Sequence, residues 1–470
     1  MQRKILFVLT VILCGWFSDL SACTIFSAKD KKGHVWAGNN EDMYFTFNTY
    51  LNIVSKTDSS YGYIYFSYYS PSEYPQGGVN EAGLFYDGNA LNPSKTKYKG
   101  YNKKMDFPGG PTAIIHHIMS KCKTVQEVFS IVEKYRVQGL EGAQIHVADK
   151  YGNLGIIVAD SMWITKSGYQ ISTNYNLCHP DKDGVKCWRF PIAERILKSN
   201  EPCFDTFREI CDSTSQKSIV STIYSNIQDL NTGDIWFYYG MDYDNAYKTT
   251  ISDLLKKGNT SILFRELFSK NPLVEVYNIY KSKGVNESLK KLNKYELSLD
   301  KKNEILRLLS TDLILFNHEF RSYPFISDLI KSKKETDEFL QVTYAIALFN
   351  DGKKEEAIDI LKKYLNEKPK STLANDYLNH MQGVFKDGAN IKFELTGFNN
   401  AKYVFVDGFT YPNFKYFLIQ KEGKWIGEFK LPPNEYSYHF SIDGERVMDP
   451  NNPDIIKKQG IDYNRIIIKK

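Results

Sequence analysis

The stretch from Cys23 to Ala28 constrains this chain most, because it directly follows an apolar leader. The leader has a basic pair at Arg3–Lys4, an apolar run over 5–17 and small residues at 21–22. This layout is typical of a secretory signal peptide, and the apolar run is too short to span a bilayer as a helix. We therefore expect cleavage after residue 22, which leaves Cys23 first, with an α-amine and a thiol on one Cα.

A leading cysteine carries a nucleophile and a base on one residue. A thiol needs a base to become a good nucleophile, and an α-amine with a pKa of roughly 7.7–8 is partly neutral near pH 7–8. A second interpretation stays open. Residues 20–23, Leu-Ser-Ala-Cys, also match a bacterial lipobox, in which Cys23 is lipidated and its amine is blocked.

The length of 470 residues predicts roughly three domains at about 150 residues each. We place a signal peptide at 1–22, a catalytic domain at 23–268, an α-helical region at 269–384 and a β-domain at 385–470. The basic residues are spread out, which gives nucleic-acid binding no support. No C-x-x-C pair, GxGxxG motif or P-loop is present, so we expect neither a metal nor a cofactor. In an exported protein, disulfides could join Cys178 to Cys187 and Cys203 to Cys211.

The first elements after Cys23 form a predicted β-hairpin. Residues 25–28 and 34–38 have strand character, and Asp30 to Gly33 between them is a turn signal. The second arm runs into Asp42, which the hairpin would bring back toward Cys23. There the carboxylate either holds the amine and orients the thiol, or only caps a loop.

Further elements of the first domain follow from pattern. Residues 111–120 and 124–135 are predicted helices, the second with a capping box of Thr124 and Glu127. His116 and His117 are adjacent, so they point to different helix faces, and we expect both to be structural. A strand–turn–strand is expected over 144–159, a strand end at 171–176 and another hairpin over 219–239. Strand pairs around two helices favour a layered α+β domain.

Several motifs in this half, in the right order, resemble a known family. They are Cys23-Thr24, the pair Asn40 and Asp42 with the aspartate nineteen residues after Cys23, the segment Asn80 to Leu84, the pair Thr173-Asn174, and Arg189 ahead of a helix. The set is similar to the N-terminal-nucleophile (Ntn) linear amide hydrolases, which include choloylglycine hydrolase, penicillin V acylase and acid ceramidase. The resemblance covers about half of the chain.

The resemblance implies a four-layer αββα fold and four catalytic roles. Cys23 would attack an amide carbonyl while its own amine relays the proton, and Asp42 would position both groups. Asn174 would donate to the oxyanion, and Arg189 would organise the site electrostatically. Asn89, Asn80 and Asn39 are further candidate positions for substrate or oxyanion contacts.

One position departs from the family pattern. The family has an arginine three residues before the aspartate, and this chain has Asn39 there. A permanent cation that favours the thiolate is therefore missing. Another base substitutes for it, or the cysteine pKa is less depressed, or the activity is altered.

The second half contains two further regions. Residues 273–381 are predicted to be helical, and Gly352, Ala357 and Pro369 fall at tetratricopeptide-like offsets. From residue 390 onward, aromatic strands resemble the glycogen-binding, immunoglobulin-like β-sandwich. The stacking tryptophan expected after residue 409 is missing, because the chain has Tyr411 to Phe414 there, and Trp425 is expected in the core.

Two functions follow from these observations. The first is an exported cysteine hydrolase that releases an acyl group from an amine or amino acid, acting on a small-molecule acyl-amide. The second is a non-catalytic surface lipoprotein, anchored at Cys23, whose terminal sandwich binds glycan. The substrate is not readable, because its choice depends on aromatic-rich segments such as 45–74, which we expect to be pocket loops.

Overall fold

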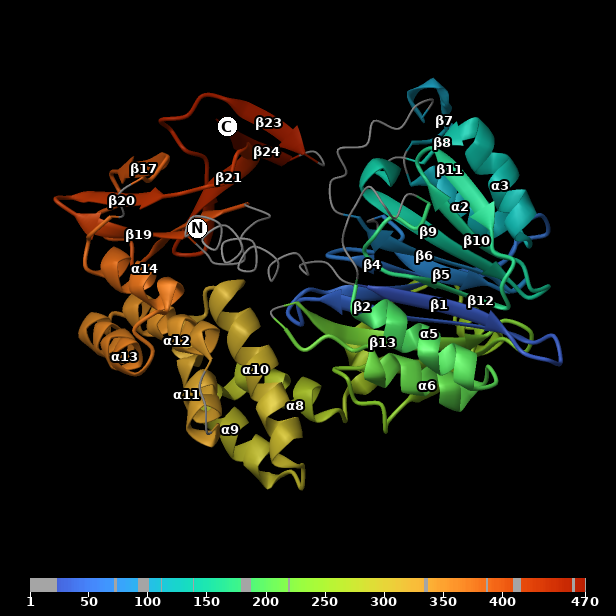
Figure 1. Cartoon of the computed structure of the whole chain (residues 1–470), viewed down its shortest axis with the longest axis horizontal. Helices are drawn as coiled ribbons and strands as arrows, with labels where there is room; N and C mark the ends of the chain where they lie inside the picture. The colour runs from blue at the N-terminus through green and yellow to red at the C-terminus, as the bar shows by residue number, and fades with distance from the viewer. Residues whose placement is uncertain are drawn as a thin grey trace, which may run out of the picture. The chain divides into compact units, whose positions relative to one another are not determined.

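The computed structural model describes residues 23–469 except 72–73, 92–100, 111, 138, 179–186, 219, 334–336, 386–387, 409–415 and 459–460. The chain is a mixed α+β protein with several sheets (Figure 1). It divides into two compact units, one ending at Glu275 and the other beginning at Val276. No helix within the described residues combines the length and the apolar character needed to cross a bilayer.

The predicted hairpin starts the first sheet. β1 and β2 pair antiparallel, with Lys29 opposite Val35 and Thr24 opposite Asn40, around the turn that follows Asp30. In spatial order the strands of this sheet are β12 (Tyr169–Ser172), β1 (Thr24–Lys29), β2 (Val35–Met43), β13 (Ser221–Asp229), β14 (Asp234–Tyr239) and β15 (Tyr247–Thr250). The hairpin therefore lies between two later segments of the chain.

The second sheet corrects one expectation. The predicted pocket loops at 45–74 contain two of its strands. In spatial order its strands are β11 (Ser161–Ile164), β10 (Leu154–Val158), β9 (Ala143–Asp149), β6 (Leu84–Ala90), β5 (Gly77–Asn80), β4 (Tyr63–Tyr68), β3 (Thr49–Val54) and β16 (Thr260–Leu263). Every residue of β4 is buried, so its aromatic side chains are core, not loop.

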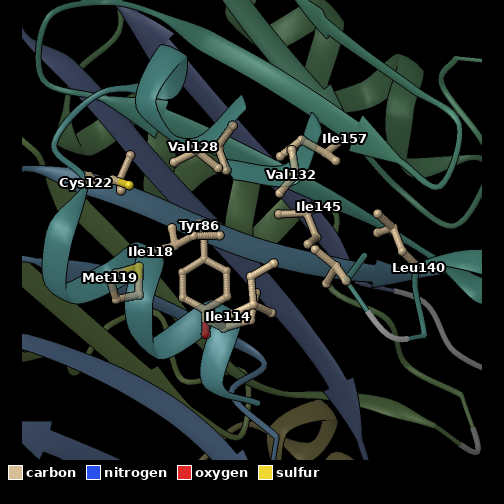
Figure 2. Packing of buried hydrophobic residues seen from close by; sticks show 14 of the residues in the cluster. Tyr86, Ile114, Ile118, Met119, Cys122, Val128, Val132, Leu140, Ile145 and Ile157 are labelled. Atoms are coloured by element: carbon tan, nitrogen blue, oxygen red, sulfur yellow. The ribbon is translucent and has the colours of Figure 1, made fainter. Parts of the chain in front are cut away.

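Helices α2 (Ala113–Lys121) and α3 (Val125–Lys134) pack on the second sheet. Figure 2 shows their side chains, among them Ile118 and Val128, against Tyr86 and Ile145 of the strands. The capping box of Thr124 is confirmed in α3. Both histidines of α2 are structural as expected, since His116 bonds Tyr63 and His117 packs on Phe107.

Helices α5 (Arg189–Ser199) and α6 (Phe204–Ser213) pack on the first sheet. Ala193, Ile196 and Phe207 of these helices share one core with Phe26 of β1 and Ile227 of β13. The other side of the first sheet contacts the second sheet. There Phe66 of β4 stacks on Tyr224 of β13 with ring centroids 4.8 Å apart.

His146 of β9 joins the two sheets through hydrogen bonds. Its Nε2 lies 2.7 Å from Ser27 Oγ of β1, and its Nδ1 lies 3.0 Å from Ser172 Oγ of β12. Burial lowers the pKa of this histidine to about 3. The imidazole is therefore neutral at ordinary pH and acts as a structural bridge.

Several short elements complete this unit: β7 (Met105–Asp106), β8 (Tyr135–Arg136), α7 (Ile251–Leu255), and the 3-10 turns η1 (Tyr101–Lys103), η2 (Leu140–Gly142) and η3 (Phe264–Phe268). The described cysteines Cys23, Cys122, Cys178, Cys187, Cys203 and Cys211 are all unbridged. The disulfides considered from the sequence are thus not formed in this structure.

Helices fill the stretch for which helical periodicity was predicted. They are α8 (Pro272–Lys283), α9 (Val285–Lys294), α10 (Leu299–Leu315), η4 (Phe320–Ser322), α11 (Tyr323–Ser332), α12 (Glu338–Asn350), α13 (Lys354–Glu367) and α14 (Thr372–Met381). Gly352 has φ +90° in the turn between α12 and α13, and Ala357 is buried in α13. Gly352 and Ala357 therefore belong to the helix pair α12–α13, and the tetratricopeptide likeness stays a prediction.

The C-terminal strands form one continuous hydrogen-bonded path. Its order is β17 (Ile391–Thr396), β20 (Lys424–Phe429), β19 (Tyr416–Lys421), β18 (Val404–Asp407), β21 (Asn434–Ile442), β24 (Ile461–Ile468) and β23 (Ile455–Lys458), with β22 (Glu445–Val447) paired to β21. Trp425 is confirmed as core, since its ring is buried and Nε1 donates to the Phe398 carbonyl at 2.9 Å. The segment from Tyr411 to Phe414 lies outside the described residues. The immunoglobulin-like sandwich stays a prediction.

Candidate active site

Cys23 stands at the start of β1, opposite the end of β2. The last paired residues of the hairpin are Thr24 and Asn40, so one further step of the antiparallel register sets Cys23 opposite Glu41. Directly opposed residues project to the same face of a sheet. The hairpin thus brings Glu41 to the thiol. It also brings Asp42, one residue later, close to Cys23, as the sequence predicts.

The alternation of β2 sends its polar side chains in two directions. Asn40 and Asp42 point to the side covered by helices: Asn40 Nδ2 donates to the Cys211 carbonyl of α6 at 2.8 Å. Asn39 and Glu41 point to the second sheet, where the Tyr68 hydroxyl of β4 donates to Glu41 Oε1. The end of β2 therefore supplies one acid to each side of the sheet.

Arg189 is the first residue of α5, and its side chain is 1% exposed. Its Nη1 donates to Asp42 Oδ2 at 2.7 Å, and its Nη2 donates to Asn174 Oδ1 at 3.0 Å. Thr222 Oγ1 donates to the other Asp42 oxygen at 2.5 Å. The guanidinium of Arg189, at the start of α5, therefore holds the side chains of Asp42 and Asn174 next to each other.

Asn174 and Asn89 complete the connection back to Cys23. One N–H of the Asn174 amide donates to the Ala90 carbonyl at 2.7 Å. The adjacent Asn89 of β6 donates its Nδ2 to the Cys23 carbonyl at 3.1 Å. The Asp42 backbone N–H forms a hydrogen bond with the Cys23 sulfur. Together these contacts close a ring of interactions that begins and ends at Cys23.

The structure thus brings together the four residues assigned catalytic roles from the sequence, together with Asn39 and Asn89. Asn39 Nδ2 lies 3.4 Å from Glu41 Oε2, and its Oδ1 accepts from Asn226 of β13. The oxyanion roles of Asn174 and Asn89 stay predictions. In this structure one donor of each amide is bonded to a backbone carbonyl.

Asn80 is used differently. Its Oδ1 accepts from the N–H groups of Ala82 and Leu84, and its Nδ2 donates to the Met119 and Cys122 carbonyls. Two donors and two acceptor bonds fill the capacity of an amide side chain. Asn80 therefore ties its turn to the end of α2, and this arrangement leaves it no donor for a substrate.

Sequence reasoning missed three acidic or phenolic residues around the thiol. They are Glu41 of β2 in the first sheet, and Tyr68 of β4 and Asp87 of β6 in the second sheet. The hairpin register contained a signal for Glu41, because counting back from the turn pairs position 23 with position 41. Tyr68 and Asp87 carry no such local signal, since β4 and β6 reach the site only through the packing of two sheets.

The thiol lies in an acidic environment. Burial, and after it the charges of Glu41, Asp42 and Asp87, raise the pKa of Cys23 well above its usual value. The Asp42 backbone N–H bonds the sulfur and acts in the opposite direction. Burial also raises the pKa of Glu41 to about 7, and that of Asp42 to about 7 despite the opposing charge of Arg189.

These properties define what the site can do. The Cys23 thiol is hydrogen-bonded to the Glu41 carboxyl group, whose pKa is about 7, so the thiol can transfer its proton to this group and regain it. Among the described residues, no group of three or more His, Cys, Asp or Glu side chains is arranged to hold a metal ion. The arrangement fits nucleophilic chemistry at sulfur.

Comparisons with known proteins give a structural likeness only. No family model matches the sequence, and no curated protein matches it. Penicillin V acylase from Agrobacterium tumefaciens is similar at 15% identity and a TM-score of 0.38, over 51% of this chain and 90% of that chain. A mutant of conjugated bile acid hydrolase from Clostridium perfringens is similar at 14% identity and a TM-score of 0.36, over 51% of this chain and 95% of that one.

A second variant of the same hydrolase matches at 14% identity and a TM-score of 0.37, over 51% of this chain and 96% of that chain. Each of these three likenesses covers about half of this chain and nine-tenths or more of the other chain.

Proposed function

We propose that the protein is an exported cysteine hydrolase of linear, non-peptide amide bonds, with Cys23 as nucleophile. The observation that carries the proposal is the ring of hydrogen bonds from Asp42 through Arg189 and Asn174 to Asn89 and back to Cys23. Four segments of the chain converge on Cys23 through these contacts. Packing of a small cysteine side chain does not require a buried cation and two acids beside it, so this group of charges indicates a functional site.

The proposed reaction follows cysteine amide hydrolysis. The Cys23 thiolate attacks the amide carbonyl, the amine departs, and water releases the acyl group from the thioester. Arg189 holds Asp42 and Asn174 in place, and an amide donor near the carbonyl oxygen stabilises the negative charge of the intermediate. Such a donor contributes roughly 2.7–4 kcal/mol.

The proposed fold and location accompany this reaction. We infer a four-layer αββα arrangement from the packing of α5 and α6 on one sheet, of α2 and α3 on the other, and of Phe66 against Tyr224 between the sheets. Export rests on the leader pattern ahead of Cys23. The proposed substrate is a small-molecule acyl-amide.

The test is a panel of N-acyl amides, including N-acyl amino acids, incubated with protein that begins at Cys23. Release of free amine by the wild type, and none by a Cys23→Ala variant of equal thermal stability, supports the proposal. Absence of turnover across the panel, or equal turnover by the variant, contradicts it.

A further inference from the structure

Glu41 is the acid closest in register to the nucleophile, and the reaction proposed above gives it no role. It opposes Cys23 across the hairpin, and its carboxyl group forms a hydrogen bond with the Cys23 side chain. The residue is 5% exposed. A buried carboxyl group in contact with a thiol needs a reason, because burial of an acid without a cation is unfavourable.

The partners of Glu41 hold it in one orientation. The Tyr68 hydroxyl donates to Oε1 and the Asn39 amide approaches Oε2 at 3.4 Å. Both are donors, so they stabilise the ionised carboxylate without adding a charge. The carboxylate is therefore held as a proton acceptor beside the sulfur.

No cation balances Glu41 in the described part of the site. Arg189 acts on Cys23, but its guanidinium is bonded to Asp42 and Asn174 on the helix side of the sheet. Asn39 occupies the position at which the resembled family has an arginine, and its neutral amide bonds both Glu41 and Asp87. Nearby positive charge therefore stabilises a Cys23 thiolate only weakly, so the thiol needs a neighbouring group that accepts its proton.

We propose that Glu41 is a catalytic residue: its carboxylate accepts the proton of the Cys23 thiol and returns it to the departing amine. This proposal rests on the proposed function of the same site. It assigns to a side chain the proton transfer that the family resemblance assigns to the α-amine of Cys23.

In the first step the S–H bond of Cys23 breaks, the proton moves to Glu41, and the sulfur electron pair forms a C–S bond while the carbonyl π bond becomes an oxyanion. The oxyanion collapses, the C–N bond breaks, and the amine takes the proton from Glu41. Water then attacks the thioester and gives a proton to Glu41, which returns it to sulfur as the carboxylic acid leaves.

Groups from every neighbouring element act on this carboxyl. They are Cys23 ahead of β1, Asp42 on β2, Tyr68 on β4, Asp87 on β6, Tyr224 on β13 and, through Cys23, Arg189 on α5. Burial raises the pKa of Glu41 to about 7. Reactivity of the thiol should therefore fall as the pH decreases through about 7, where Glu41 becomes protonated.

The test is the rate of alkylation of Cys23 by iodoacetamide between pH 5 and 10, followed on the Cys23 peptide by mass spectrometry. Peptide-level detection is needed because Cys203 is exposed. We expect an inflection near pH 7 in the wild type. In Glu41→Gln the inflection should move up by at least one pH unit, and the rate at pH 7 should fall at least tenfold.

Two further variants keep the test decisive if Glu41→Gln folds poorly. Tyr68→Phe removes a donor to the carboxylate, so the inflection should move upward while the limiting rate at high pH is retained. Glu209→Gln, a change of the same charge on the exposed face of α6, should leave the profile unchanged. A merely structural role of Glu41 would lower the rate equally at all pH values, and this result overturns the proposal.

The amine is tested separately with a chain that retains Ala22 ahead of Cys23. An unchanged alkylation profile in this chain supports Glu41 as the acceptor. A profile that is lost in this chain but intact in Glu41→Gln overturns it. Because alkylation needs no amide substrate, a Glu41-dependent profile without turnover of any amide would reject the hydrolase and keep the proton acceptor.

Discussion

Arg189 and Asp42, 147 positions apart in the chain, form an ion pair of 2.7 Å in which both side chains are essentially inaccessible to solvent. Removal of one partner of such a pair strongly destabilises the fold, because the remaining charge stays buried without a counter-charge. Here it also sets the place of Asn174, which bonds the same guanidinium. The pair therefore couples the stability of the first unit to the geometry around Cys23.

We expect Arg189→Gln to destabilise the first unit by about 3–5 kcal/mol, since it leaves Asp42 buried and uncompensated. Urea unfolding followed by fluorescence measures this loss. The double variant Asp42→Asn/Arg189→Gln removes both charges, so its loss should be smaller than the sum of the single losses. A loss below 0.5 kcal/mol in Arg189→Gln would mean that the ion pair is not buried.

The stability of the first unit should fall as the pH rises through the range of about 5 to 7. Glu41 has a pKa raised from 4.5 to about 7, so between these values the folded state binds more protons than the unfolded state. The stability present below pH 4.5 is thus lost as the pH passes 7, by up to roughly 3 kcal/mol for this group. Asp42 adds in the same direction.

Thermal unfolding at pH 5.5 and pH 8 measures this dependence. Glu41→Gln cannot ionise, so it should unfold at a higher temperature than the wild type at pH 8 and show a weaker pH dependence. A wild-type melting temperature that rises from pH 5.5 to 8, with no difference in the variant, would contradict an elevated pKa at this position.

The glycine of the segment from Asn80 to Leu84 should be needed for folding and not for chemistry. Gly83 has φ +80°, and a Cβ there would lie 2.6 Å from the Leu230 carbonyl oxygen. We expect Gly83→Ala to cost about 2 kcal/mol or more, from the left-handed backbone and this clash. Gly168→Ala, where a Cβ meets nothing within 4 Å, is the control and should be neutral. An equally neutral Gly83→Ala would remove the structural explanation of the motif.

Much of the first unit could be predicted from local pattern. The hairpin after Cys23, the capping box of Thr124 and the hairpin expected over 219–239 depend on neighbours in sequence, and the structure contains all three. The segment 45–74 was misassigned because β4 is buried throughout. A strand covered on both faces loses the alternation of polar and apolar residues that identifies a strand.

The site itself was only partly predictable. Asp42 follows from the hairpin, whereas Asn174 and Arg189 could be proposed only through the family resemblance, because β12 and α5 reach Cys23 by tertiary packing. Glu41 also follows from the hairpin register, because one step beyond the pair of Thr24 and Asn40 sets position 41 opposite position 23. The side chain of Asn80, although part of a motif, forms all of its hydrogen bonds with its own turn and with the end of α2.

Cys23→Ser should fold and lose turnover. Serine is close to cysteine in size, but its hydroxyl is a far weaker acid, so a carboxylate that titrates near pH 7 deprotonates it poorly. We expect at least about a hundredfold loss of kcat, in line with the contribution of general base catalysis. Circular dichroism and thermal unfolding check the fold. A serine variant with near wild-type kcat would place the nucleophile elsewhere.

The most direct measurement is the mass of the protein during turnover. Protein beginning at Cys23 is mixed with an N-acyl amide that it cleaves, quenched in acid within the burst phase, and digested. We expect the acyl group as a thioester on the Cys23 peptide of the wild type and no adduct in Cys23→Ala. Turnover without any adduct on Cys23, or a diacylglyceryl mass on Cys23 of the isolated protein, would contradict its assignment as the nucleophile.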